Sequence, residues 1–461
     1  MVLRRDIPRF DALARCGVRG PRGLCRGVLR PQSATCSLAV ITHDKDPVIG
    51  LLSPCGWGNL GDAAIQDAVI AAIRSRWPNA KIVGFTSNPR DTQERHGVPA
   101  YPLSGYAPPT YGIGGRMLPR TAGPIDRALQ RLQGVPLLRS VALPLRLMCD
   151  FLQSEPLHWA LALRWVRQLD LLIVSGGGQL DDFWGRAWGH PYVLWKWSFL
   201  ARRTHTPVVM LSVGLGTLRT RLARVFVRGA LSRMTYRSYR DERTRTEVAR
   251  LLGQAHDGPV APDLAFGLEP VRCRPPRLNA GVVGISPMAY CDPRVWPIKD
   301  GAVYQRYVER LASLVVRLID TGRRVVLFST DTCDRLVMDD VWAAAGCPVL
   351  ARRANTTTLP ALFGELAQLD VVLASRLHGV ILAHLAECPV VALSYDWKVA
   401  QHMAEMGQTE YCVEIDAFDV PALAVVLERL EDRSDAVRAT LRQRLGDYRS
   451  RVQRQFEETL Q

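Results

Sequence analysis

The chain has 461 residues, with 59 Lys and Arg against 44 Asp and Glu, so its formal net charge is +15. This length exceeds what one hydrophobic core usually supports, and it predicts two domains of ordinary size plus extensions. No apolar run approaches the ~20 residues that cross a bilayer, which excludes an integral membrane protein. The eleven cysteines form no CxxC pair and show no metal-ligand spacing with histidine. Neither a zinc site nor a disulfide framework is therefore expected, and scattered thiols suit a reducing cytosol.

Residues 1–45 form a basic leader that we expect to be a disordered extension. Residues 1–40 hold eight Arg and two Asp, a net +6, so the remaining chain carries +9. The leader lacks the continuous apolar stretch of a secretory signal, although a targeting segment is an alternative interpretation. The mildly basic body suits an anionic substrate or an acidic membrane surface. Because the charge is spread and no nucleic-acid-binding motif is present, a nucleic-acid partner is not expected.

From Pro47 onward, short apolar runs alternate with helical periods. PVIGLLSP predicts the first strand, and the helix that follows over 62–77 has Asp62 in position to cap it. KIVGFT, LDLLIVSGGG and TPVVMLSVGLG predict further strands that end in glycine or small polar residues, as strands of parallel sheets do. Residues 234–253 repeat the pattern, with Gly253 in the expected C′ position. Residues 46–267 are thus predicted to form an N-terminal Rossmann-like domain.

Residues 116–168 depart from this alternation. They contain eight Arg against three acids among many Leu and Val, with proline breaks. We expect an inserted helical subdomain that packs on the first sheet. The other interpretation is a basic amphipathic surface that rests against anionic lipid.

A proline-rich segment without periodicity, residues 268–279, is predicted to link two domains. After it AGVVGISP, RRVVLFST, CPVL, LDVVLAS and CPVVALSY predict strands, separated by helices such as the one over 303–322. Residues 280–461 are therefore predicted to form a second Rossmann-like domain that ends in helices. The expected fold class is α/β, with two doubly wound parallel sheets that face each other across a cleft.

Charged side chains follow several of the predicted strands. SRLHG places Arg376 and His378 at the carboxyl end of a strand, where open α/β sheets bind ligands. Arg240 and Lys398 follow other strands. Guanidinium groups pair bidentately with carboxylate or phosphate, an ammonium acts as a point charge, and histidine moves protons near neutral pH. The set suits a ligand that carries both a carboxylate and a phosphate. Taken singly, His378 is equally well a helix cap or a core histidine, and Lys398 a solvated helix lysine.

Two glycine loops, GNLGD and SGGGQLDD, are candidates for the other side of the cleft. Backbone N–H groups at helix N-termini bind anions, so such loops add to an anion site. Each loop alone is a weak signal, since GGG after a strand is common in α/β proteins. The candidate loop residues are Asn59, Gly61, Asp62, Gly176, Gly177, Gly178, Gln179 and Asp181. No metal site is predicted.

In chain order, the motifs GNLGD, LIVSGGGQLDD, PVVMLSVGLG, YRSYRDERT and ASRLHGVILAHLAECPVVALSYDWK resemble the polysaccharide pyruvyl transferase family, from about residue 48 to about residue 415. The resemblance implies a GT-B-like fold, with the acceptor bound by the N-terminal domain and the donor by the C-terminal one. It also implies transfer of the pyruvyl group of phosphoenolpyruvate onto two hydroxyls of a sugar, which forms a cyclic ketal in exopolysaccharide biosynthesis for the cell envelope. Phosphoenolpyruvate would be a co-substrate, and no cofactor is expected.

The resemblance also assigns roles to particular residues. The family's Arg-Leu-His turn falls on Arg376, Leu377 and His378, its later lysine on Lys398 and the arginine of its S-x-R-D segment on Arg240. His378 would be catalytic, and the others would bind phosphoenolpyruvate. One departure is Ala63, where the family often has Glu, so the choice of acceptor is expected to differ.

Several alternatives remain open at this point. The protein is expected in the cytoplasm, where phosphoenolpyruvate is made, at the inner face of the membrane if its sugar acceptor is lipid-linked rather than nucleotide-linked. One rival function is a nucleotide-sugar glycosyltransferase of the same architecture, since fold alone does not fix function. The other is a non-catalytic relative that binds glycan.

Overall fold

The computed structural model describes residues 46–110, 113–116, 136–183, 185–254, 258–269 and 281–460. The predicted leader, residues 1–45, lies outside the described residues. So do residues 117–135 of the predicted insertion and nearly all of the predicted linker, which stays a prediction.

The first sheet has six parallel strands in the order β3-β2-β1-β6-β7-β8. They are β1 (Val48–Leu52), β2 (Lys81–Thr86), β3 (Ala100–Pro102), β6 (Leu171–Ser175), β7 (Val208–Val213) and β8 (Tyr236–Tyr239). Residues of β6 and β7 are buried throughout, as expected for a parallel sheet with helices on both faces. The strand order reverses between β1 and β6, which makes this the switch point where such sheets bind ligands.

The second sheet repeats this permuted order with β11-β10-β9-β12-β13-β14, again all parallel. Its strands are β9 (Val282–Ser286), β10 (Arg324–Leu327), β11 (Ala351–Arg353), β12 (Val371–Ala374), β13 (Val390–Ser394) and β14 (Cys412–Glu414). The switch point here lies between β9 and β12. The predicted fold class, two doubly wound parallel sheets, is confirmed.

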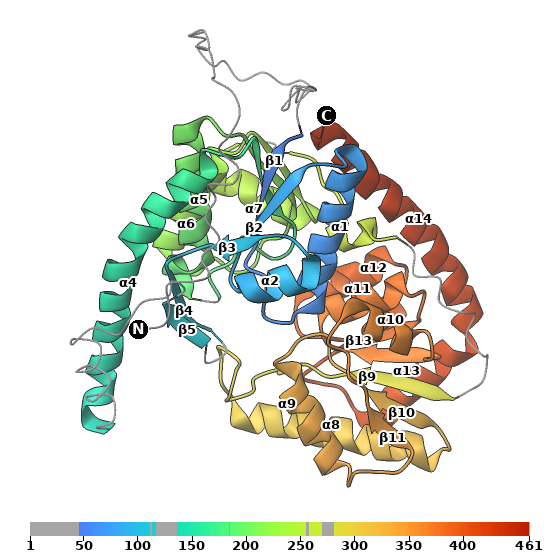
Figure 1. Ribbon diagram of the computed structural model, residues 1–461. Coiled ribbons are helices and arrows are strands. Elements are labelled where there is room, and N and C mark those ends of the chain that lie inside the picture. Colours follow the sequence, from blue (N-terminus) through green and yellow to red (C-terminus); the bar gives the residue numbers. More distant parts are fainter. Residues whose placement is uncertain are drawn as a thin grey trace. The chain divides into compact units, whose positions relative to one another are not determined.

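Helices cover both sheets (Figure 1). In the first half they are α1 (Leu60–Arg76), α2 (Pro89–His96), α4 (Pro136–Val166), α5 (His190–Thr204), α6 (Arg221–Leu231) and α7 (Glu242–Leu252), with short 3₁₀ turns η2 (Arg186–Trp188) and η3 (Leu264–Gly267). In the second half they are α8 (Gly301–Asp320), α9 (Asp334–Ala344), α10 (Leu359–Leu366), α11 (Leu377–Leu385), α12 (Trp397–Glu405), α13 (Val420–Asp432) and α14 (Ser434–Thr459), with η4 (Thr409–Tyr411). None of these described helices is long and apolar enough to cross a bilayer.

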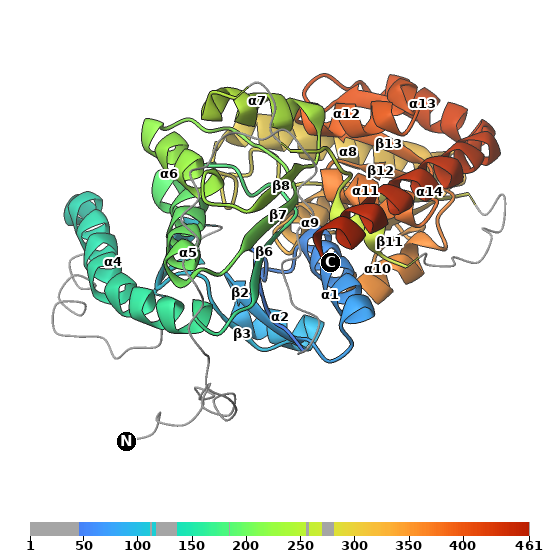
Figure 2. The same ribbon diagram turned by 90° about the horizontal axis from the view of Figure 1, so that it is seen from above.

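The last helix, α14, connects the second half of the chain back to the first. Figures 1 and 2 show it running from α13 to the end of α1. Near its end, the Gln455 side chain accepts a hydrogen bond from the Ser212 hydroxyl of β7 at 3.0 Å. Arg76 of α1 donates to the Leu460 carbonyl at 3.3 Å. The C-terminal helix therefore helps to fix one sheet relative to the other.

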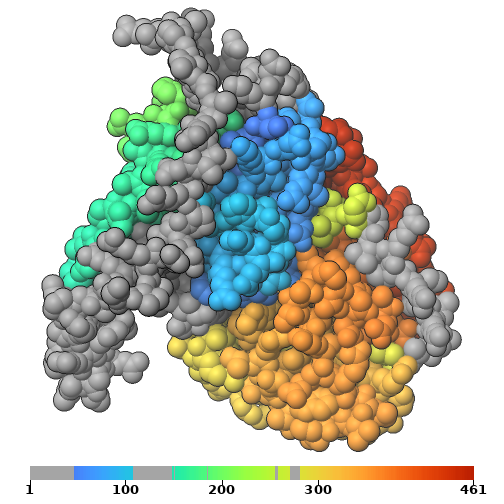
Figure 3. Space-filling view, viewed as in Figure 1, coloured from blue at the N-terminus to red at the C-terminus, as the bar shows by residue number. Residues whose placement is uncertain are grey.

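The two halves also meet directly beside α1. The Leu60 N–H donates to the Thr330 carbonyl at 2.8 Å, and Arg95 donates to the Thr357 carbonyl at 2.9 Å. In the space-filling view the blue residues of α1 and α2 lie against the orange residues of the second half (Figure 3). These contacts bring the carboxyl ends of β1 and β12 to one place.

Several local predictions are wrong. The predicted strand CPVL is a turn, in which Cys347 has a positive φ and Val349 is fully exposed, and the strand begins only at Ala351. Asp62 is not the cap of α1, because Asn59 takes that position. Gly253, by contrast, caps the end of α7 as predicted, and the structure places Asp241 as the cap of its other end.

The chain just before and within the predicted insertion, residues 116–168, has elements that the sequence did not indicate. Before α4 the chain forms an antiparallel hairpin of β4 (Tyr106–Thr110) and β5 (Ile113–Arg116). Helix α4 runs through Pro144 and Pro156, so these prolines do not break it. Each proline removes one helical N–H, and α4 is nevertheless continuous over 31 residues.

Candidate functional site

A cleft of about 1200 Å³ opens between the carboxyl ends of the two sheets. Residues from both switch points line it, as expected for doubly wound sheets. The cleft brings together most of the predicted site residues, namely Asn59, Asp62, Gly176, Gly177, Gly178, Gln179, Asp181, Arg240, Arg376, Leu377, His378 and Lys398. Gly61 lies directly beneath the His378 ring.

His378 is in the first turn of α11, directly after β12, and its ring packs across the domain boundary onto α1. A Cβ atom on Gly61 would lie far closer than 3.0 Å to the His378 ring, so only glycine fits there. The His378 side chain is 14% exposed, and its Nε2 atom has no hydrogen-bond partner in the described structure. The His378 ring lines the cleft, where a histidine side chain can exchange a proton with a ligand.

Asp263 lies between His378 and Arg240. One of its carboxylate oxygens, Oδ2, is 3.3 Å from Arg240 Nη1 and 3.6 Å from His378 Nε2. The other, Oδ1, accepts a hydrogen bond from the Ala265 N–H at 3.0 Å and caps η3. Burial alone would raise the pKa of the Asp263 carboxyl, but the charges of His378 and Arg240 outweigh it and hold that pKa well below its usual range. Asp263 is thus a fixed negative charge that orients both cationic groups.

Arg376 is held by two acidic residues that follow β10, Asp331 in the loop and Asp334 at the start of α9. Its Nε and Nη2 atoms form a fork with the Asp334 carboxylate, the second at 2.9 Å, and Nη2 lies 3.0 Å from Cys333 Sγ. Burial alone would lower the pKa of the Arg376 guanidinium, but the charges of Asp334 and Asp331 outweigh burial and raise it. The Nη1 atom lies 3.6 Å from Asp331, beyond hydrogen-bond distance, and keeps donors for a ligand.

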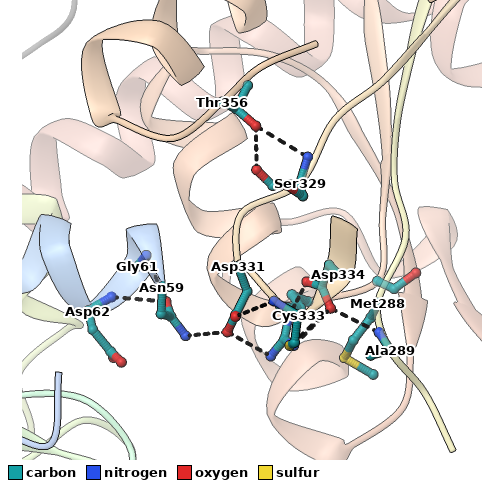
Figure 4. A network of polar contacts seen from close by, with 12 residues as sticks. Asn59, Gly61, Asp62, Met288, Ala289, Ser329, Asp331, Cys333, Asp334 and Thr356 are labelled. Carbon is teal, nitrogen blue, oxygen red and sulfur yellow. Dashed lines mark hydrogen bonds and ion pairs between the residues drawn. The ribbon is translucent and has the colours of Figure 1, made fainter. Parts of the chain in front are cut away.

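Asn59 connects the first half of the chain to this acidic loop (Figure 4). Its Oδ1 atom accepts from the backbone N–H groups of Gly61 and Asp62 at 2.9 and 3.2 Å, which caps α1. Its Nδ2 atom donates to Asp331 at 3.2 Å. One side chain therefore starts the helix that carries Gly61 and also fixes that helix relative to Arg376 and His378.

Because Asn59 takes the cap, the carboxylate of Asp62 is left to face the cleft. Burial raises the pKa of the Asp62 carboxyl; the charge of His378 acts in the opposite direction, while Asp331 and Asp263 raise it further. A carboxyl group with a raised pKa next to a histidine is typical of acid–base sites.

Lys398 is at the start of α12, after β13, and is half-buried in the cleft wall. Its amino group has no hydrogen bond or ion pair with any described residue. Burial lowers the pKa of that amino group, the nearby Arg240 lowers it further, and Asp396 and Asp181 oppose both effects. An ammonium without an ion pair among the described residues is suited to an anionic ligand.

The GGG loop after β6 is shaped by its own backbone. Gly176 and Gly177 have φ values of +52° and +72°, which disfavour other residues, whereas a Cβ on Gly178 would meet open space. The Gln179 side chain is already hydrogen-bonded within the protein. Its amide N–H groups donate to the carbonyls of Ser175 and Gly176, and its Oε1 contacts His190. Of the predicted loop residues, Gly178 is the one most open to a ligand.

Asp181 faces Lys398 from the first half of the chain. Burial raises the pKa of its carboxyl, and a hydrogen bond from the Phe183 N–H and the charge of Lys398 oppose that rise. A side chain on Gly216 would collide with the Asp181 carboxylate, so the GLG turn after β7 makes room for it.

Sequence reasoning missed the acidic residues that hold the cations. Asp263 and Asp331 are in loops without periodicity, Asp334 is the first residue of α9, and their partners are far away in the chain. The sequence did contain one indication, because Asp331 and Asp334 follow a predicted strand and Asp263 precedes a turn. The aromatic residues Tyr395 and Trp397 were also missed, although they shortly precede Lys398 and line the cleft.

The two Rossmann-like sheets and the cleft between their carboxyl ends define a protein of the two-domain GT-B architectural class. Sequence comparison then places it more narrowly. The polysaccharide pyruvyl transferase family model matches residues 59–396, which is most of the chain. The protein belongs to the polysaccharide pyruvyl transferase family. No curated protein sequence matches it.

Similar solved structures agree on the fold. A UDP-N-acetylglucosamine 2-epimerase superposes with a TM-score of 0.53 at 12% identity, over 90% of this chain and 95% of the other. A putative UDP-N-acetylglucosamine 2-epimerase from Listeria monocytogenes superposes with a TM-score of 0.52 at 8% identity, over 86% of this chain and 91% of the other. The UDP-GlcNAc 2-epimerase from Neisseria meningitidis bound to UDP-GlcNAc superposes with a TM-score of 0.51 at 11% identity, over 90% of this chain and 99% of the other. At such low identity these similarities concern the fold alone.

Proposed function

We propose that this protein transfers the pyruvyl group of phosphoenolpyruvate onto two hydroxyls of a sugar, forming a cyclic ketal and releasing phosphate. The observation that carries the proposal is the convergence of Arg240, Arg376 and Lys398 around His378 in one cleft. Phosphoenolpyruvate carries a carboxylate and a phosphate on three carbons, and it needs several cations within a small volume. Membership of the family supports the same reaction.

The proposed reaction begins with proton transfer. His378, as imidazolium, gives its proton to the methylene carbon of phosphoenolpyruvate, and positive charge develops on the adjacent carbon. A sugar hydroxyl forms a C–O bond with that carbon, and its proton passes to Asp62. The C–O bond to phosphate then breaks, and phosphate leaves with the bonding electrons and takes the proton from Asp62. The second hydroxyl closes the ketal as its proton returns to His378. Arg240, Arg376 and Lys398 stabilise the charge on the carboxylate and the leaving phosphate.

The acceptor is proposed to lie against the first half of the chain. Asp62 and Gly178 face the cleft there, while Asn59 and Gly61 hold α1 in position. Ala63 is buried in α1, and a larger acidic residue at this position would not be accommodated without repacking. Because phosphoenolpyruvate is a cytosolic metabolite, we also propose that the reaction occurs in the cytoplasm, on an envelope glycan precursor.

The rival donor is a nucleotide sugar, which the fold by itself would also accommodate. Ligand-induced stabilisation separates the two, because a ligand that binds only the folded protein raises its unfolding temperature. We expect phosphoenolpyruvate to stabilise the protein and the Lys398→Ala variant to respond less. Stabilisation by a nucleotide sugar and none by phosphoenolpyruvate would favour the glycosyltransferase. Stabilisation by a glycan alone, without turnover, would favour the non-catalytic relative.

The function is tested with His378→Ala and a panel of sugar acceptors. We expect turnover to fall on the order of 10²- to 10⁴-fold, the usual contribution of acid–base catalysis, while stabilisation by phosphoenolpyruvate persists. His205→Asn is a matched control, because His205 is exposed, lies in a different pocket and has a positive φ that asparagine tolerates. Turnover of His378→Ala within a few-fold of wild type would remove His378 from the proton-transfer step.

A further inference from the structure

Helix α6 has an outer face that mixes arginine with apolar side chains. Its inner face packs Phe226, Val227 and Leu231 into the core. Outside, Leu222 and Val225 are 39% and 62% exposed, and the neighbouring arginines Arg221, Arg224 and Arg228 are exposed as well. None of these three arginines forms an ion pair with a described residue. Exposed apolar side chains that gather beside polar ones mark surfaces that bind a partner.

The apolar part of this face extends beyond α6. Trp188 of η2 is 49% exposed, and its ring lies 5.5 Å from that of Phe226 and 5.3 Å from that of Phe151 in α4. Next to Phe151, Leu152 is 61% exposed. Figure 2 shows α4 and α6 on either side of α5. The exposed side chains of α6, together with Trp188 and Leu152, are called the α6 surface below.

The charge of this region has one sign. Residues 218–232, which span α6, contain four arginines and neither Asp nor Glu. The α6 surface also adjoins the cleft, since Trp188 and Arg224 line the cleft mouth. Arginine with exposed leucine, valine and tryptophan is the composition of protein surfaces that rest in the headgroup region of an anionic bilayer.

We propose that the α6 surface binds anionic lipid bilayers and presents the cleft mouth to a sugar acceptor held in the membrane. Charge complementarity selects this partner: the arginines pair with lipid phosphates, while Leu222, Val225 and Trp188 enter the interface. The proposal deepens the proposed function, because it makes the acceptor lipid-linked. The surface differs from the predicted basic segment 116–168, of which it includes only part of α4.

Vesicle sedimentation tests the surface without any turnover. The full-length protein is mixed with phosphatidylglycerol–phosphatidylcholine vesicles or with pure phosphatidylcholine vesicles, at low and high salt. We expect binding to the anionic vesicles at low salt only. The double variant Arg221→Gln, Arg228→Gln should bind about 30-fold more weakly, at ~1 kcal/mol for each arginine.

Two further variants make the test specific. Arg444→Gln with Arg454→Gln removes the same charge from exposed positions on α14 and should bind within about two-fold of wild type. Leu222→Ser with Val225→Ser should weaken binding while retaining every charge. No binding of folded wild type to anionic vesicles, an equal loss in both arginine variants, or arginine-dependent binding to RNA but not to vesicles would overturn the proposal.

Failure of the membrane proposal is distinguishable from failure of the proposed function. Phosphate release from phosphoenolpyruvate with a water-soluble sugar is expected to be unchanged in the Arg221→Gln, Arg228→Gln variant. If wild type binds vesicles but never uses phosphoenolpyruvate, the surface stands and the donor assignment fails. If it uses phosphoenolpyruvate with soluble sugars and never binds vesicles, the donor assignment stands and the membrane proposal fails.

Discussion

Replacing Gly61 with alanine would test how closely the two halves of the site must fit. Gly61 is in the first turn of α1, has no positive φ, and lies under the His378 ring. In a helix, alanine is favoured over glycine by about 1 kcal/mol, so the backbone itself should tolerate the change. The added Cβ, however, would lie far inside the 3.4–4 Å of ordinary van der Waals contact with that ring.

Relief of this collision requires the ring or helix α1 to shift on the order of 1 Å. A misplacement of that size costs about 100-fold in rate, so we expect Gly61→Ala to lower kcat about 100-fold. Phosphate release from phosphoenolpyruvate in the presence of acceptor measures kcat, and thermal unfolding reports whether the protein stays folded. Gly446→Ala is the control, because Gly446 is also helical and a Cβ there would meet open space.

A double variant shows whether the effect passes through His378. If Gly61→Ala acts by displacing His378, then adding it to His378→Ala should cause little further loss, since the two changes remove the same interaction. Wild-type kcat in a folded Gly61→Ala protein would refute the reasoning. So would full additivity of the two changes.

Four further outcomes follow from the charges at the site. Burial raises the pKa of the Asp62 carboxyl, so the folded protein favours its protonated form. The resulting stabilisation of the fold is complete below the ordinary carboxyl pKa of about 4. It is lost as pH rises through the raised pKa of Asp62. Asp62→Asn should therefore raise the unfolding temperature at neutral pH but not at acidic pH, while activity falls; a pH-independent gain would contradict the assignment. Asp263→Asn should lower kcat about 100-fold with little change in KM, because the carboxylate positions His378 and Arg240. Steady-state kinetics measure both constants, and a change in KM alone would contradict this role. Lys398→Ala should raise KM for phosphoenolpyruvate. In the wild type, donor affinity should fall as pH rises through the lowered pKa of the Lys398 amino group, and this fall should be absent from the variant. Asp334→Ala should cost about 3 kcal/mol in urea unfolding, because it leaves the Arg376 guanidinium buried without its partner, and a loss well under 1 kcal/mol would show that the fork is dispensable.

Much of the fold is visible in the sequence because it depends on local pattern. Buried strands such as β6 and β13 are continuous apolar runs, and α8 and α11 have clear helical spacing, so their order alone implies parallel sheets. Short edge strands such as β3 and β14 were missed, since three residues carry no period. The continuity of α4 through Pro144 and Pro156 was missed because proline normally predicts a break.

The site was only half visible for a different reason. The cations and His378 follow strands within recognisable motifs, and strand ends predict their convergence. What holds them does not follow from a local pattern: Asp263 reaches His378 from the start of η3, beyond α7, and Asp334 reaches Arg376 from the start of α9. The exchange of roles between Asn59 and Asp62 was equally hidden, because both residues are good helix caps and only the contact of Asn59 with Asp331 decides between them.

The most direct test of the account is incubation of the protein with phosphoenolpyruvate and lipid-linked, nucleotide-linked and free sugars. Released phosphate is measured together with the mass of each sugar. The account predicts equimolar phosphate release and a mass gain on one sugar equal to pyruvate less water, both abolished in His378→Ala. Transfer of a glycosyl group from a nucleotide sugar, or phosphate release without a mass gain on any sugar, would contradict it.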